Sequence, residues 1–332
     1  MSLHDVNYQH WTGSHHGIWR RRWVIASNGL RSCLGNKLAR HLVLVAWIIA
    51  FIEIAILFVI GQLLVEDSLL YKLVNQLGGQ QRDFIDGLVS WIIGHPEISV
   101  RTTYNILFCF FATNLRLFAM ISVALVIPHL ITWDLSSRAI IVYSSKAISR
   151  FDYFLGKFGT VFGLLSLMWL GPVLTAWFAG NLLASDWTFF WHSRGALLNT
   201  LLYVVTAMTI LSIVSLGISA LSSRPRAATS YWIIFWLVGN AIRTIGEHTK
   251  PWLRHFSISY DLDQISLKIF NLDDEIHLAQ DNIPLFGALL ADFMRGTFFR
   301  WLEVPELSGA VAALAVMVTG AIIIMHQRVK PE

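Results

Sequence analysis

Charged residues are scarce in this sequence. Asp, Glu, Lys and Arg make up only 14% of the 332 residues, whereas hydrophobic residues make up 55%. Soluble domains average about 25% charged and about 45–50% apolar residues, so the composition excludes an ordinary soluble domain. Several long apolar runs indicate membrane spans, because about 20 apolar residues are needed to cross a bilayer core. Helices are expected, since each span must satisfy its own backbone hydrogen bonds.

Cysteine is almost absent, and a cleavable signal peptide is not expected. Cys33 and Cys109 fall in a predicted cytoplasmic segment and a predicted span, so they cannot form a disulfide framework. The first apolar run begins only after about forty polar, aromatic and basic residues, which is too late for a signal peptide.

Sequence motifs for catalysis are also missing. The Gly-Lys dipeptide at 156–157 is followed by Phe158, and Phe151 stands where a phosphate-binding loop needs its first glycine. No G-x-S-x-G nucleophile motif is present. A cluster of His10, His15 and His16 lacks the spacing of a metal site and is expected to be a solvated tail. We therefore expect no enzyme and no catalytic, cofactor-binding or metal-binding residues.

Six apolar segments are long enough to be transmembrane helices. They lie at about 42–64, 105–128, 158–184, 196–221, 228–247 and 308–326. The fifth is the least apolar and carries Asn240 and Arg243. No linker or internal repeat divides the chain, so residues 42–332 are expected to form one membrane domain behind a cytoplasmic segment at 1–41.

Basic residues predict the orientation of these spans. They gather in alternate segments, at Arg20, Arg21, Arg22, Arg31, Lys37 and Arg40, at Arg138, Lys146, Arg150 and Lys157, at Arg224 and Arg226, and at Arg328 and Lys330. The other segments mix basic with acidic residues. The positive-inside rule then predicts a multi-pass protein of the inner (plasma) membrane with both termini in the cytoplasm. This explains the net charge of +4 without nucleic-acid binding.

The segment before the first span is expected to be an amphipathic interfacial helix. Trp19, Trp23 and Leu30 alternate with arginines, a pattern that suits an anionic cytoplasmic leaflet. The alternative is a simple positive-inside anchor. The outer segments at about 65–104 and 248–307 are long enough to fold back on the membrane, with interfacial helices expected near 84–93 and 285–302.

Two charged residues lie inside predicted spans. Glu53 is at the midpoint of the first span, and Arg116 is within a residue of the midpoint of the second. Since these spans run in opposite directions, both charges reach the same depth, where charges normally pair or face a cavity. We expect an intramembrane Glu53–Arg116 pair, either structural or lining a translocation route.

The cytoplasmic stretch after the second span is the most specific feature. As a helix it would place Ile140, Tyr143, Ala147, Phe151 and Phe154 on one face. Arg138, Lys146 and Arg150 lie off that stripe. Such a helix has an apolar face that another surface can cover, although an interfacial connector would look the same.

This stretch resembles the permease subunits of type-2 ABC exporters (ABC-2 type transporter permeases). In that family an acidic residue is followed by Gly-Thr-Leu, a Ser-Arg-Pro-Ile-Ser-Arg-like turn and a Gly-Lys that enters the third span. The matching positions are Asp134, then Ser145, Lys146, Ile148, Ser149 and Arg150, then Gly156 and Lys157. Arg138-Ala139-Ile140 replaces Gly-Thr-Leu, and Ala147 replaces Pro. The motif covers only residues 128–157.

The resemblance implies a dimer of two permease chains, identical or different, with the cytoplasmic helix docked on a separate ABC ATPase. ATP and Mg would bind that partner subunit, and this chain would hold no cofactor. The implied ATPase-coupling residues are Asp134, Arg138, Ile140, Tyr143, Lys146, Ser149, Arg150 and Phe151. Membrane lipids are the remaining expected partner.

Two other functions stay open. A secondary transporter often has broken helices at mid-membrane, and Gly171-Pro172 is a candidate break in the third span. A membrane-embedded enzyme or assembly scaffold without ATP coupling is the other. In each case the expected fold is all-α, with six transmembrane helices, an interfacial N-terminal helix and a cytoplasmic coupling helix.

Overall fold

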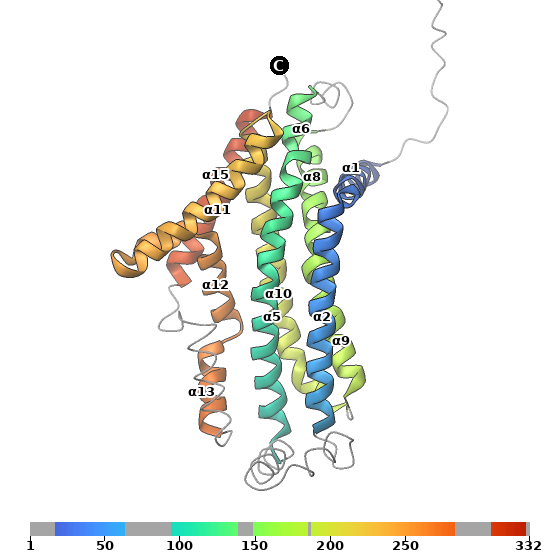
Figure 1. The fold of residues 1–332 in the computed structure, drawn as a ribbon, viewed down its shortest axis with the longest axis vertical. Coiled ribbons are helices and arrows are strands. Elements are labelled where there is room, and N and C mark those ends of the chain that lie inside the picture. Colours follow the sequence, from blue (N-terminus) through green and yellow to red (C-terminus); the bar gives the residue numbers. More distant parts are fainter. Residues whose placement is uncertain (1–16, 64–93, 139–148, 185–186, 283–306, 330–332) are drawn as a thin grey trace, which may run out of the picture.

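The computed structural model describes residues 17–63, 94–138, 149–184, 187–282 and 307–329, and all regular structure within these ranges is helical (Figure 1). The first half contains α1 (Ile18–Gly35), α2 (Lys37–Leu63), α5 (Pro96–Val126), the 3-10 turn η1 (Ile127–His129), α6 (Ile131–Ser136), α8 (Arg150–Leu165), the π-helix η2 (Ser166–Leu170) and α9 (Gly171–Leu183). The second half contains α10 (Thr188–Ala220), α11 (Pro225–His248), the 3-10 turn η3 (Pro251–Phe256), α12 (Ile258–Ile269), α13 (Leu272–Asn282) and α15 (Leu307–Arg328).

Five helical segments are long and apolar enough to cross a membrane. They are Lys37–Gln62, Pro96–Ser136, Arg150–Leu183, Phe189–Ala220 and Leu307–Arg328. These coincide with five of the six predicted spans, so the prediction of an all-helical membrane protein is confirmed. The predicted fifth span, 228–247, is helical as part of α11 but is not among the five. Its polar residues, which include Asn240 and Arg243, lower its mean hydropathy.

The path of the chain explains how both described ends reach the same end of the bundle. We call the end that holds α1, α6 and the last turn of α15 the α1 end, and the opposite end the α13 end (Figure 1). α10 finishes at the α1 end, and α15 also finishes there, so the chain between them must return toward the α13 end. α11, η3, α12 and α13 make this return together, with α11 inclined away from the bundle.

The segment α12–α13 lies alongside α5 and not outside the membrane domain as the sequence suggested. Asp263 of α12 pairs with Arg116 of α5, and Glu275 of α13 pairs with Arg101 near the start of α5. Because Arg116 is central in the helical segment Pro96–Ser136, α12 lies beside the middle of that segment. Residues 258–282 were expected in an outer segment, and the structure packs them against the bundle instead. The interfacial helices expected near 84–93 and 285–302 lie outside the described residues.

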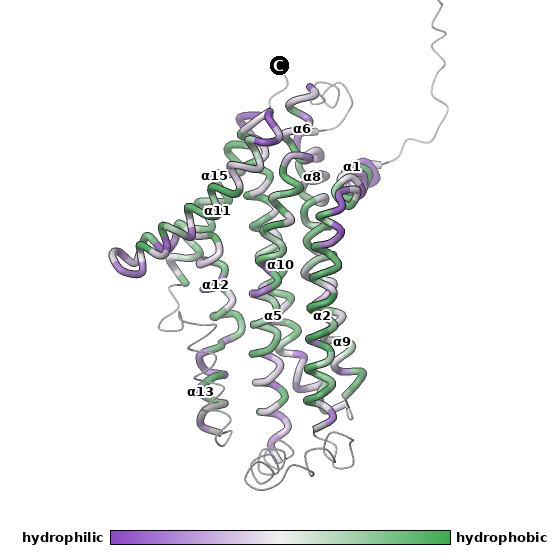
Figure 2. The backbone as a smooth tube through the Cα atoms, viewed as in Figure 1, coloured by the Kyte–Doolittle hydropathy of each residue, from purple (hydrophilic) through white to green (hydrophobic). Residues whose placement is uncertain are grey.

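The N-terminal helix α1 packs closely on α8. A Cβ added at Gly156 would meet Ile25 at 2.7 Å, and one added at Gly29 would meet Thr160 at 2.2 Å. Both positions are glycine because the Ile25 and Thr160 side chains occupy the space that a Cβ would need. Trp19 and Trp23 remain 78% and 71% exposed, and Figure 2 shows hydrophilic stretches in α1 against a largely hydrophobic α2. The predicted helix is confirmed by α1, and its location at the membrane interface stays a prediction.

Both cysteines are expected to be chemically inert in the folded protein. Cys33 and Cys109 are buried free thiols, and burial raises the pKa of the Cys33 thiol to about 11. Since the thiolate is the reactive form, maleimide at pH 7 should modify neither residue in the folded chain and both after unfolding in SDS. Mass spectrometry after timed labelling measures this. Rapid labelling of Cys33 alone would contradict the packing of α1.

Candidate functional site

Buried polar groups at the α1 end join the two ends of the predicted coupling segment. The Asp134 carboxylate of α6 lies 2.7 Å from the Lys157 ammonium of α8 and accepts a 2.7 Å hydrogen bond from the Tyr153 hydroxyl. Lys157 also donates to the backbone carbonyl of Leu130 at 2.9 Å. Asp134 and Lys157 are only 7% and 8% exposed. Charges buried to this extent need partners, and here each finds the other.

This ion pair changes the expected role of Asp134. Sequence reasoning grouped it with residues that would touch an ATPase, but its burial leaves it facing the protein interior. Its ion pair with Lys157 holds α6 against α8, where the segment that connects these two helices begins and ends. The acidic residue and the Gly-Lys of the exporter-like motif thus meet in space, although 23 positions separate Asp134 from Lys157.

The start of α8 is fixed by a capping arrangement. The Ser149 hydroxyl accepts a hydrogen bond from the Asp152 backbone N–H at 3.1 Å and donates to the Asp152 carboxylate at 2.6 Å. The same carboxylate accepts from Arg22 Nε of α1 at 2.7 Å. A Ser three residues before an acidic residue is a helix-start signal, so Ser149 acts on its own helix. Arg22 then links the N-terminal helix to it.

The remaining predicted coupling residues divide into two groups. Arg138, Arg150 and Phe151 are exposed, and Phe151 is 66% exposed. Arg138 has a φ of 55°, in the left-handed region, where a non-glycine residue marks a sharp turn after α6. Ile140, Tyr143 and Lys146 lie outside the described residues.

The predicted pair of Glu53 and Arg116 is wrong. Arg116 Nη1 lies 2.6 Å from Asp263 Oδ1 of α12 and 3.4 Å from the Tyr203 hydroxyl of α10. Side-chain exposure is 13% for Arg116 and 18% for Asp263. Sequence reasoning missed Asp263 because it was placed in an outer loop. The expectation that a charge in a span takes a partner holds for Arg116; the partner was misidentified.

Glu53 has a different environment. Its side chain is fully buried, and neither carboxyl oxygen has a hydrogen-bond partner among the described residues. An ionised carboxylate without a partner is very costly in a medium that cannot solvate it. An ionised Glu53 would therefore need a partner from outside the described residues.

The third span contains an irregular turn that contacts the helix of Glu53. The π-helix Ser166–Leu170 precedes Gly171-Pro172, and the Trp47 indole of α2 donates a 3.0 Å hydrogen bond to the Leu167 carbonyl. Proline cannot donate to the helix ladder and crowds the preceding turn, and a π-turn relieves this. Such turns occur often at functional sites. The candidate break at Gly171-Pro172 is thus a local widening within a helix that continues.

A polar cavity of about 410 Å³ lies at the α13 end between α5, α10 and α13. Glu275 is its best-partnered residue, accepting from Arg101 Nε at 2.9 Å, Thr102 Oγ1 at 2.8 Å and Asn105 Nδ2 at 3.1 Å. His192 and Arg194 also line it. This cavity makes a hydrophilic vestibule at one end of an otherwise apolar bundle.

The described side chains contain no cluster of three or more His, Cys, Asp or Glu residues arranged to hold a metal ion. No protein-family model matches the chain, and no curated protein is significantly similar to it.

Proposed function

We propose that this chain is the membrane-spanning permease subunit of an ATP-driven ABC exporter. A separate ATPase would dock on the segment between α6 and α8 and would carry the ATP and Mg. The observation that supports this most is the buried Asp134–Lys157 pair. The pair joins two positions at which the sequence resembles the exporter motif. It also links α6, which follows α5, to α8, so that a movement of a docked ATPase would be transmitted to both α5 and α8.

The remaining parts of the proposal follow from the same arrangement. Two permease chains would enclose the route, with α11–α13 standing in place of the fifth span and both termini in the cytoplasm. The α1 end would then face the cytoplasm of the inner membrane, with α1 at its surface. α11 has an exposed apolar face suited to lipid or a second permease, formed by Tyr231, Ile234, Leu237, Val238 and Ile245.

Photo-crosslinking from the α1 end tests ATPase docking. A benzoyl-phenylalanine at Trp133 or Phe151, which are 53% and 66% exposed, should crosslink in native cells to a soluble protein that contains a G-x-x-x-x-G-K-[ST] loop. The crosslinked protein is identified by mass spectrometry. The purified permease should hydrolyse no ATP alone.

Trp187 is the matched control, because it is 72% exposed but follows α9 at the α13 end. No ATPase should be captured there. The docking proposal fails if Trp133 and Phe151 give no ATPase crosslink while the chain is inserted normally, or if Trp187 captures the ATPase equally well.

Proton-driven secondary transport is the second candidate, and Glu53 is the observation that favours it. Its carboxyl lies inside a span without a hydrogen-bond partner among the described residues, on a helix that contacts a π-turn, and such a group can take up and release a proton. Substitution of Glu53 separates the two functions, as argued in the Discussion.

A further inference from the structure

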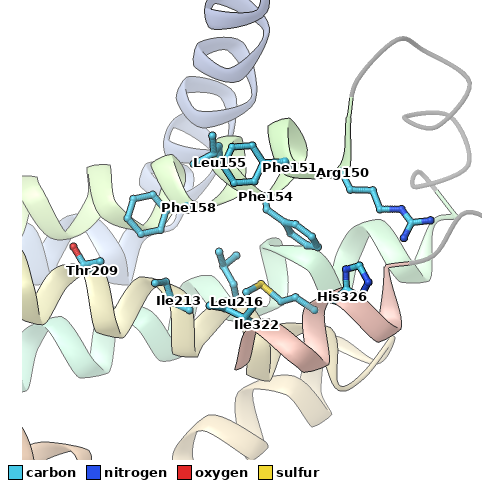
Figure 3. Close-up of a pocket in the computed structure, with 11 residues that line it drawn as sticks. Arg150, Phe151, Phe154, Leu155, Phe158, Thr209, Ile213, Leu216, Ile322 and His326 are labelled. Atoms are coloured by element: carbon cyan, nitrogen blue, oxygen red, sulfur yellow. The ribbon is translucent and has the colours of Figure 1, made fainter. Parts of the chain in front are cut away.

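An apolar groove of about 630 Å³ runs between α8, α10 and α15 near the α1 end (Figure 3). Phe154 and Phe158 of α8 form one side, and Ile213 and Leu216 of α10 lie opposite. All three helices belong to segments that can cross a membrane. The groove is therefore a feature of the membrane-embedded surface.

Charge is confined to one end of the groove. Figure 3 shows Arg150 and His326 together at that end, where α8 begins and α15 finishes. Both side chains are exposed. Toward the other end the lining is apolar apart from Thr209. This distribution matches a molecule with an anionic head and a long apolar tail.

The depth of the groove argues for a lipid over a soluble partner. The nine residues from Arg150 to Phe158 are separated by eight steps of 1.5 Å and span roughly 12 Å along α8. Half of the bilayer hydrocarbon core is about 15 Å thick, so the groove has the length of one leaflet's acyl region. A soluble protein docked on Phe151 would not reach Phe158 or Ile213.

We infer that this groove binds one anionic phospholipid, with an acyl chain along Phe154, Phe158 and Ile213 and the phosphate beside Arg150 and His326. Basic pockets between membrane helices are suited to such head groups. The binding requires only that the chain lies in a membrane, so it stands independently of the proposed ATPase.

Native mass spectrometry of the purified, delipidated chain tests the inference without any ATPase. Palmitoyl-oleoyl phosphatidylglycerol should bind at the first site at least about tenfold more tightly than the phosphatidylcholine analogue. Arg150→Gln should weaken the phosphatidylglycerol affinity roughly fivefold, since a basic residue near an anionic head group contributes about 1 kcal/mol. His326→Gln should also weaken it, since the imidazole lies beside Arg150 at the same end of the groove.

Leu216→Trp places a larger side chain in the groove and should abolish this first binding event. Leu202→Trp, at an exposed position of α10 outside the groove, and Arg226→Gln, an exposed basic residue at the start of α11, should bind as wild type does. Equal affinity for the two lipids would overturn the inference. So would unchanged phosphatidylglycerol binding in Arg150→Gln and Leu216→Trp, or a crosslink that seats residues 139–148 in the groove of the lipid-free chain.

Discussion

Asp263→Leu is expected to lower the free energy of unfolding by about 3–5 kcal/mol. It leaves the Arg116 guanidinium, whose side chain is 13% exposed, without the carboxylate that lies 2.6 Å away, and breaking one half of a largely buried ion pair has a cost of that order. The Tyr203 hydroxyl, at 3.4 Å from Arg116, cannot replace a negative charge. Denaturant titration in bicelles, followed by tryptophan fluorescence, measures the loss.

The double variant Arg116→Met/Asp263→Leu should recover most of that stability. Removing both charges removes both desolvation costs, and apolar replacements of buried pairs are often neutral. The coupling energy from the double-mutant cycle should therefore be large and favourable. If the double variant is as unstable as Asp263→Leu, the pair does not hold α12 against α5.

The Arg243–Glu247 pair of α11 is the matched control. It is a four-residue-spaced pair within one helix, 3.2 Å apart, with Glu247 29% exposed at its side chain. Four-residue spacing along a helix brings these two side chains together, and they pair in the structure. Partly exposed pairs of this kind contribute about 0.3–0.5 kcal/mol, so Glu247→Gln should have a small effect.

Local patterns predicted those parts of the fold that depend on one helix at a time. Apolar length identified five helical segments that can cross a membrane, and the alternation of aromatic and basic residues indicated the N-terminal helix α1. The failures at the charged residues involve partners distant in sequence. Asp263 looks like a loop residue by composition, and only the packing of α12 on α5 shows that it neutralises Arg116.

The same reasoning explains the outcome at the motif. The resemblance to the exporter motif singled out Asp134 and Lys157 but did not indicate whether their side chains are exposed or buried. An exposed docking residue and a residue of a buried ion pair look the same in a sequence. Their 2.7 Å contact depends on how α6 meets α8. The groove between α8, α10 and α15 could not be predicted either, since its residues come from three separate segments.

Glu53→Gln gives the clearest separation between the two candidate functions. Glutamine keeps the size and polarity of the neutral acid but cannot release a proton. If ATP hydrolysis by a partner drives transport, the variant should transport at a rate close to wild type. A proton-driven transporter should instead lose coupled transport by about 100-fold or more, because the proton-transfer group is gone. Accumulation in vesicles under an imposed pH gradient, with and without ATP and the ATPase, measures both cases.

Glu53→Met tests the structural cost of the same carboxyl. Both carboxyl oxygens are buried without a hydrogen-bond partner among the described residues, and an unmade buried hydrogen bond costs about 1–3 kcal/mol. Methionine has a similar length and no polar atom, so the variant should be more stable than wild type by about that amount. Glu247→Gln, whose carboxylate is paired and partly exposed, should bring no such gain. A loss of stability in Glu53→Met would show that Glu53 has a polar partner in the native membrane. If the Glu53→Met variant is more stable than wild type and still transports normally with ATP, Glu53 takes no part in proton coupling.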